Sequence, residues 1–261
     1  MVDQEKAWPP IRDAGTLIIV RSRSMDAMPE ILMIRRAETL RFAGGAMVFP
    51  GGVVDDADHA FASSLGAGHD AEDMAARIAA VRETIEECGL ALTAAGGALL
   101  PGQLEALRDA LHEGRGLGEL AHSYGLRFDF DALIPFTRWC PRSWEVRVRY
   151  DARFYIAVTE GGHDALTPDG TETSALCWSS ASDMLARAEA GEARLLFPTR
   201  CVLERLAGLT SVDELLNHAR AHPPGLITPW LEMRNGEEHV CIPDGYGYPV
   251  IARPAQGAVR S

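Results

Sequence analysis

DAEDMAARIAAVRETIEECGL, residues 70–90, is the stretch that decides the fold. Apolar side chains recur in it at spacings of four, three, four and three, at Met74, Ile78, Val81, Ile85 and Cys88. This period predicts an amphipathic helix over 70–88 that buries one face against the rest of the protein. Gly89 is its expected end, because glycine readily adopts the left-handed conformation that terminates many helices.

The last turns of this predicted helix carry three glutamates. Glu83, Glu86 and Glu87 lie at i, i+3 and i+4, so their side chains point to one side of the helix. Crowded carboxylates raise one another's pKa, and a bound divalent cation with a preference for oxygen ligands, Mg²⁺ or Mn²⁺, offsets that cost. A solvated face is the simpler alternative, and it holds for most glutamate-rich helices. Acidic groups at a helix C-terminus oppose the macrodipole, however, which favours a functional role here.

Short apolar runs predict the strands of a sheet. They lie at 16–20, 31–34, 46–49, 146–158 and 173–180. The third run ends at Pro50-Gly51-Gly52, where missing side chains let the backbone approach another group closely. A loop containing glycine and histidine is expected between this turn and the helix.

Further helices are predicted at 103–113, 182–190 and 198–208, and from Ser211, where Ser-Val-Asp-Glu matches a capping box. The stretch after Pro223 is rich in Pro and Gly and is expected to be irregular. Strands, one strong helix, more strands and then helices indicate an α+β or layered α/β/α fold.

Composition narrows the function classes. The 261 residues are 47% hydrophobic and 24% charged, which is typical of folded globular proteins. Twenty-five Lys and Arg against 37 Asp and Glu give a net charge of −12, which argues against a nucleic-acid partner. No apolar run approaches the ~20 residues of a membrane span. The five scattered cysteines suit neither a disulfide framework nor a zinc site, and we expect a cytoplasmic protein.

Residues 82–90, RETIEECGL, resemble the second half of the Nudix box, Gly-x5-Glu-x7-Arg-Glu-U-x-Glu-Glu-x-Gly-U with U aliphatic. Gly52 begins the counterpart of the first half, in which Asp58 replaces Glu. Sixteen extra residues separate the halves, and Thr84 stands at an aliphatic position. The resemblance implies a Nudix-type α/β/α sandwich with a mixed central sheet. We expect a single domain over 1–261 with a box insertion at about 59–81 and a C-terminal helical extension at about 182–261.

A second resemblance lies just upstream. Residues 31–52, ILMIRRAETLRFAGGAMVFPGG, are similar to the signature of the coenzyme A diphosphatase branch of this family. The positions in register are Leu32, Arg35, Ala37, Arg41, Gly45 and Phe49-Pro50-Gly51-Gly52, whereas Met33 and Arg36 depart from it. The resemblance implies substrate binding by Arg35, Arg41, Gly45 and Gly51. A solvated arginine is the alternative for Arg41.

The family resemblance also implies site roles. Mg²⁺ or Mn²⁺ would be held by Glu83, Glu86, Glu87 and the carbonyl of Gly52. Arg82 is expected to pair with a box carboxylate and hold it in place. The base is expected either on the box helix, at Glu83, or on a later loop, where Glu172 is preferred to Glu160.

The implied reaction is metal-assisted attack of water on a diphosphate, with coenzyme A or acyl-coenzyme A as the favoured substrate. The partner is then a small nucleotide, and a homodimer is possible. Hydrolysis of ADP-ribose, NADH or a nucleoside triphosphate is the nearest alternative, and a non-catalytic ligand sensor is an alternative of another class. Cys88, Trp139, Trp144 and Trp178 are predicted to serve packing rather than nucleophilic attack or base stacking.

Overall fold

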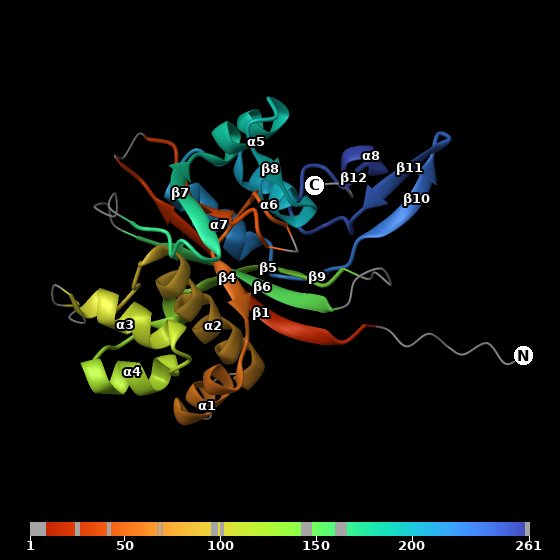
Figure 1. Cartoon of the computed structure of the whole chain (residues 1–261). Coiled ribbons are helices and arrows are strands. Elements are labelled where there is room, and N and C mark those ends of the chain that lie inside the picture. The colour runs from red at the N-terminus through yellow and green to blue at the C-terminus, as the bar shows by residue number, and fades with distance from the viewer. Residues whose placement is uncertain are drawn as a thin grey trace, which may run out of the picture.

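The computed structural model describes residues 9–23, 27–40, 43–66, 68, 70–94, 99, 102–141, 148–159 and 166–258. Within these ranges a nine-stranded mixed sheet forms the centre of the molecule (Figure 1). Its main strand order is β8-β3-β2-β1-β6-β5-β9, with β4 also paired to β1 and β7 to β2.

The predicted strands are present, and the first two, β1 and β2, run longer than expected. The bounds are β1 Ile11–Arg21, β2 Glu30–Arg36, β3 Ala46–Val48, β4 Gly51–Val53, β5 Ile134–Trp139, β6 Arg149–Val158, β7 Thr173–Ser179, β8 Arg194–Leu195 and β9 Leu226–Ile227. β1 and β6 pair in parallel along their length. β2 and β7 are antiparallel, and their register shifts between Arg35 and Arg36.

The amphipathic helix is confirmed as α2, Ala71–Cys88. The Asp70 side chain caps its start by accepting from the Asp73 N–H, and Gly89 ends it at φ 64°. The other helices are α1 Asp56–Ser64, α3 Gln103–His112, α4 Leu117–Tyr124, α5 Ala181–Glu189, α6 Phe197–Leu206 and α7 Val212–Ala221.

The loop expected after Gly52 was a wrong prediction, because α1 occupies most of it. Asp55 caps this helix, and Asp58 returns a hydrogen bond to the Asp55 backbone N–H, which makes a reciprocal capping box. The box insertion therefore consists of most of α1 and the first turns of α2.

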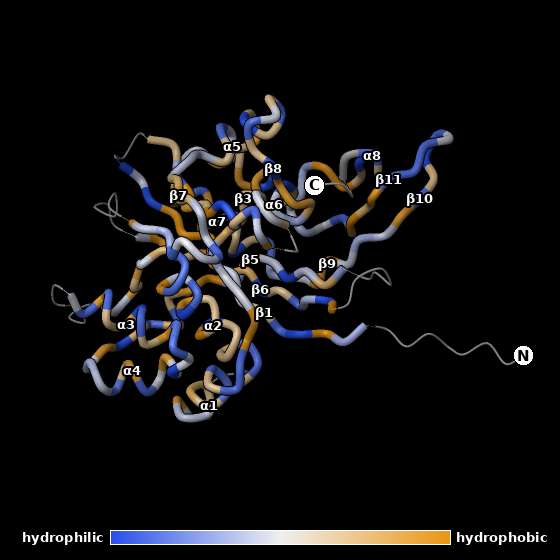
Figure 2. The backbone as a smooth tube through the Cα atoms, in the orientation of Figure 1, coloured by the Kyte–Doolittle hydropathy of each residue, from blue (hydrophilic) through white to orange (hydrophobic). Residues whose placement is uncertain are grey.

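Helices cover both faces of the sheet (Figures 1 and 2). Strand residues alternate between the faces, so Leu17 and Ile19 pack in the cluster that contains α2, whereas Ile18 and Val20 pack with α6. Cys88 is fully buried against the first cluster, as predicted. Trp139 is buried too, while Trp144 lies outside the described residues.

The C-terminal stretch departs from both the helical and the irregular expectation. After α7 the chain forms a separate three-stranded antiparallel sheet of β10 Trp230–Arg234, β11 Glu237–Cys241 and β12 Ala252–Pro254, followed by α8 Ala255–Ala258. In Figure 1, β10 and β11 project away from the central sheet. None of the helices in the described part of the chain is long and apolar enough to cross a membrane.

Candidate active site

Arg82 lies at the centre of the candidate site and contacts three carboxylates. Its Nη1 donates to Glu83 Oε1 at 2.9 Å and to Glu86 Oε1 at 3.2 Å, while Nη2 donates to Asp58 Oδ2 at 2.9 Å. Nη2 also donates to the carbonyl of Val53 in β4. Burial alone would lower the pKa of Arg82, but these carboxylates more than offset it, so the pKa is raised and the side chain stays charged.

Asp58 ties the insertion to this arginine. The side chain is 1% exposed, and burial raises its pKa even though Arg82 acts in the opposite direction. Because Asp58 also closes the capping box of α1, one carboxylate fixes both the helix start and the Arg82 guanidinium. Its packing against Arg82 was not foreseen from the sequence, where it is visible only as the Asp that replaces a family Glu.

Gly51 and Gly52, at the start of β4, come as close to the acidic cluster as the sequence predicts. A Cβ on Gly52 would lie 2.2 Å from Glu83 Oε1, so any side chain there would collide with this carboxylate. The Gly51 N–H donates to Glu87 Oε2 at 2.9 Å, and Gly51 has a φ of +152°, which favours glycine. The backbone therefore positions two of the three glutamates.

The negatively charged side chains of Glu83, Glu86 and Glu87 lie close together and are largely shielded from solvent. Burial, followed by the charges of Glu86 and Glu172, raises the pKa of Glu83 to about 7 against the opposing effect of Arg82. Burial and the charge of Glu83 raise the pKa of Glu87 well above its usual value. Burial raises these pKa values, which a fully solvated helix face would not do, and this favours a functional role for the cluster.

The donor set suits a hard divalent cation, since it consists of carboxylate oxygens that gain from added positive charge. The described residues do not already gather three such ligands around one point. Instead, Arg82 bridges Glu83 and Glu86 and supplies the positive charge between them. A cation would be held by Glu83, Glu86 and Glu87.

The structure brings Arg36 rather than Arg35 to the acidic cluster. The charge of Arg36 lowers the pKa of Glu87, and its Nε is buried without a hydrogen-bond partner in the described structure. Arg35 is exposed and pairs with Glu38 at 2.9 Å. Adjacent strand residues face opposite sides of a sheet, and Arg36 follows the α2-side residue Ile34 at a spacing of two.

Four other residues predicted from the sequence do not contact the acidic cluster directly or lie outside the described residues. Gly45 forms a turn at φ +75°, where a Cβ would lie 2.6 Å from the Glu38 carboxylate. Glu172 is exposed at the start of β7, and its charge raises the pKa of both Glu83 and Glu87. Arg41 and Glu160 lie outside the described residues, so their predicted roles stay predictions.

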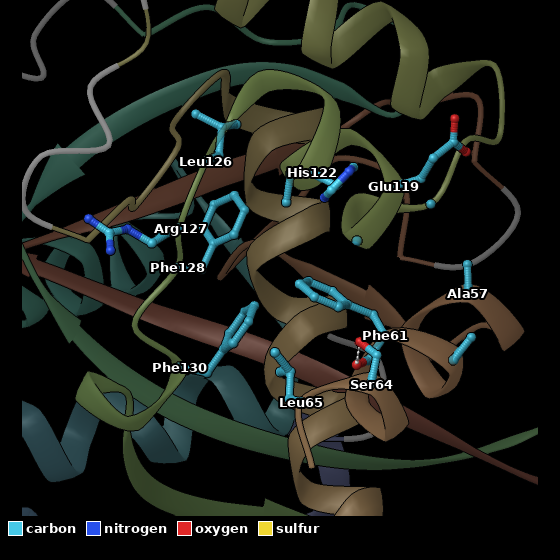
Figure 3. Close-up of a pocket in the computed structure, with 14 residues that line it drawn as sticks. Ala57, Phe61, Ser64, Leu65, Glu119, His122, Leu126, Arg127, Phe128 and Phe130 are labelled. Carbon is cyan, nitrogen blue, oxygen red and sulfur yellow. Dashed lines mark hydrogen bonds between the residues drawn. The ribbon is translucent and has the colours of Figure 1, made fainter.

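A cavity of about 770 Å³ lies beside the box insertion (Figure 3). Phe61 of α1, Phe128 and Phe130 line it, and the Phe61 and Phe130 rings meet edge to face at 5.8 Å. None of the glutamates of the acidic cluster lines this cavity. The insertion therefore forms one wall of an apolar space that is separate from the acidic site.

We compared the chain with known proteins. No family model matches the chain. A crystal structure of a NUDIX hydrolase from Alicyclobacillus acidocaldarius superposes with a TM-score of 0.68 at 31% identity, covering 81% of this chain and 97% of that one. The chain belongs to the Nudix hydrolase family. The expected family and α+β sandwich fold are thereby confirmed.

Two curated relatives agree with this family assignment. The Nudix chain is 28% identical over 239 residues to the acyl-coenzyme A diphosphatase NUDT19 of Gallus gallus, covering 71% of this chain and 63% of that relative. It is 27% identical over 223 residues to the putative nudix hydrolase 7 of Caenorhabditis elegans, covering 84% and 69%. The match thus spans less than two thirds of the first relative's length.

Proposed function

We propose that this Nudix protein is a metal-dependent hydrolase of a diphosphate that links a nucleoside to another group, with coenzyme A or acyl-coenzyme A as substrate. The observation that carries the proposal is the desolvated cluster of Glu83, Glu86 and Glu87 around Arg82. The relative from Gallus gallus, an acyl-coenzyme A diphosphatase, supports the choice of substrate.

A divalent cation bound by the three glutamates and the Gly52 carbonyl would supply positive charge to the diphosphate and lower the pKa of water. The chain's own residues do the rest. Arg82 keeps Glu83 and Glu86 in one orientation, and Asp58 keeps Arg82 in place. Arg36 offers a guanidinium to a phosphate oxygen, which suits its unpaired buried Nε.

Glu172 is the proposed proton acceptor for the attacking water. It is exposed and therefore solvated, yet near enough to the cluster for its charge to act on Glu83 and Glu87. A base needs a proton-accepting form at the working pH and access to water. Glu83 itself is the alternative base.

Hydrolysis of a substrate panel tests the proposal. The purified protein is incubated with coenzyme A, acyl-coenzyme A, ADP-ribose, NADH and dATP in Mg²⁺ or Mn²⁺, and products are separated by chromatography. We expect 3',5'-ADP from the coenzyme A species at the highest kcat/KM. Preferred cleavage of ADP-ribose, NADH or dATP would leave the chemistry in place and contradict the substrate. No turnover of any of them would favour a ligand sensor.

A further inference from the structure

A second pocket lies at the far end of β2 and β7 from the acidic cluster. It encloses about 270 Å³, and its lining includes Arg21, Arg23, Leu32 and Trp178. β2 and β7 run antiparallel, with Arg36 opposite Thr173 at one end and Leu32 opposite Trp178 at the other. The pocket and the acidic cluster therefore share the same pair of strands.

Both sites also lie on the same face of the sheet. Leu32 and Ile34 belong to the α2-side core, and Trp178 packs against that core. Arg36 lies four positions after Leu32 in β2, which is about 13 Å at the usual rise of a strand. This length is comparable to that of a nucleoside monophosphate, so one ligand can reach from the diphosphate site into the pocket.

The pocket lining combines an aromatic ring with positive charge. The Arg21 guanidinium lies over the Trp178 indole, 4.1 Å from the ring centroid. Arg21 and Arg23 each donate to Glu30 at 2.9 Å, which orients both guanidinium groups. Burial would raise the pKa of Glu30, but the two arginines more than offset it, so the pKa is lowered and Glu30 stays ionised.

Such a lining suits a flat base joined to an anion. Indole rings stack on nucleic-acid bases, and arginines bind phosphate. The described residues that line the pocket include two arginines and no acidic residue, in a protein whose net charge is −12. At about 270 Å³ the pocket lies just below the range of whole-ligand sites, so it accommodates one end of a larger substrate.

We propose that this pocket binds the nucleoside end of the substrate, with the base against the stacked Arg21 and Trp178 side chains and a ribose 3'-phosphate beside Arg23. The identity of the ligand rests on the proposed function, because coenzyme A carries a 3'-phosphate on its adenosine. Trp178 then contributes to base binding together with Arg21, in addition to the packing role that the sequence favoured for it. The 3'-phosphate would distinguish coenzyme A from ADP-ribose and NADH.

Binding without metal tests the pocket apart from catalysis. Calorimetry in EDTA compares 3',5'-ADP with 5'-AMP on the wild-type protein, Arg23→Ala and Trp178→Leu. We expect wild type to prefer 3',5'-ADP about tenfold, and Arg23→Ala to lose that preference. Trp178→Leu should weaken both ligands about tenfold. Exposed Arg220→Ala and Trp230→Leu are matched controls that should bind like wild type.

Equal wild-type affinity for the two nucleotides, or unchanged binding by both pocket variants, would overturn the proposal. Weaker binding of phosphopantetheine, but not of 3',5'-ADP, by Trp178→Leu would place the other end of the substrate here and also overturn it. Arg23 is 61% exposed, so Arg23→Ala keeps the test valid if Trp178→Leu does not fold.

Hydrolysis of coenzyme A and of dephospho-coenzyme A separates failure of this inference from failure of the proposed function. We expect Arg23→Ala to raise the KM for coenzyme A about tenfold, leave kcat unchanged, and leave dephospho-coenzyme A unaffected. Turnover of coenzyme A with no effect of Arg23→Ala would contradict only the pocket. Absence of turnover combined with binding that depends on Arg23 and Trp178 would contradict only the proposed function.

Discussion

Two buried arginines, one on each face of the sheet, have opposite surroundings. Arg82 on the α2 side contacts Asp58, Glu83 and Glu86, and its pKa is raised. Arg205 on the other side donates to His218 Nε2 at 2.9 Å and to a backbone carbonyl, and its guanidinium lies 3.9 Å from the Phe136 ring centroid. Burial lowers the pKa of Arg205.

The two arginines differ in how much of the surrounding charge they neutralise. Arg205 joins β5 to α6 and α7 through neutral and aromatic groups, which needs no excess charge. Around Arg82 there are more carboxylates than one guanidinium can neutralise, and their pKa values are raised. This excess of buried carboxylate charge, which packing does not require, is the observation behind the proposed active site on the α2 side.

Glu86→Gln should have the largest effect of the changes considered. We expect kcat to fall by about 10²–10³-fold, because the variant loses one ligand of the cation that would neutralise the negative diphosphate. The free energy of unfolding should change little, since Gln relieves repulsion in the cluster. Steady-state hydrolysis of coenzyme A measures this loss, and Glu119→Gln on the exposed face of α4 is the matched control. Full activity of Glu86→Gln would mean that the cluster is only a solvated face.

Replacing Arg35 and Arg36 one at a time tests which of these two neighbouring arginines of β2 contributes to hydrolysis. Arg36→Ala should lower kcat/KM about 10- to 100-fold, because a charge-assisted contact to phosphate is lost. Arg35→Ala should stay within about threefold of wild type, because Arg35 forms an exposed pair with Glu38. The opposite ranking would restore the substrate role that the sequence assigns to Arg35.

Arg205→Leu should lower stability and spare catalysis. Removing the guanidinium leaves His218 and the Phe136 carbonyl without their donor, at a cost of about 1–3 kcal/mol. The thermal midpoint should fall by several degrees while kcat/KM of the remaining folded protein is unchanged. A large loss of kcat/KM at a temperature where the variant is folded would show that the two faces are not functionally distinct.

The lowered pKa of His218, which lies on the same side of the sheet as Arg205, predicts a small pH dependence of stability. Burial, the Arg205 charge and His222 lower its pKa to about 4 from 6.5. The unfolded chain therefore binds a proton below about pH 6.5 that the folded protein takes up only near pH 4. Stability is full above pH 6.5 and falls as the pH drops through this window.

His218→Gln keeps an acceptor for Arg205 and removes the titration. Thermal melts at pH 7.5 and pH 5 should show a smaller loss of midpoint for this variant than for wild type. Identical losses would mean that His218 does not contribute to acid sensitivity.

Much of the fold was predictable because its signals are local. The spacing of Met74, Ile78 and Val81 and the stop at Gly89 define α2 without reference to any other part of the chain. α1 was missed because Asp stands at both positions of its capping box, where Ser or Thr followed by Glu is the usual signature. The three-stranded C-terminal sheet was missed because Pro and Gly are frequent around its short strands.

Only the part of the site that lies within one turn of α2 was predictable from the sequence. Helical spacing places Glu83, Glu86 and Glu87 together, and structure adds the contacts from distant segments. Asp58 reaches Arg82 across 24 positions of the chain, a contact that no local period reveals. Which of Arg35 and Arg36 faces the α2 side depends on strand pairing, which the local sequence does not reveal.

Titration with Mn²⁺ shows whether the carboxylates around Arg82 form a cation site. Electron paramagnetic resonance of free Mn²⁺ is followed during titration into wild type, Glu86→Gln and the control Glu119→Gln. We expect saturable binding by wild type and by the control, and at least a tenfold weaker affinity for Glu86→Gln. Equal affinity in all three proteins, or no saturable binding by wild type, would show that these carboxylates do not form a cation site.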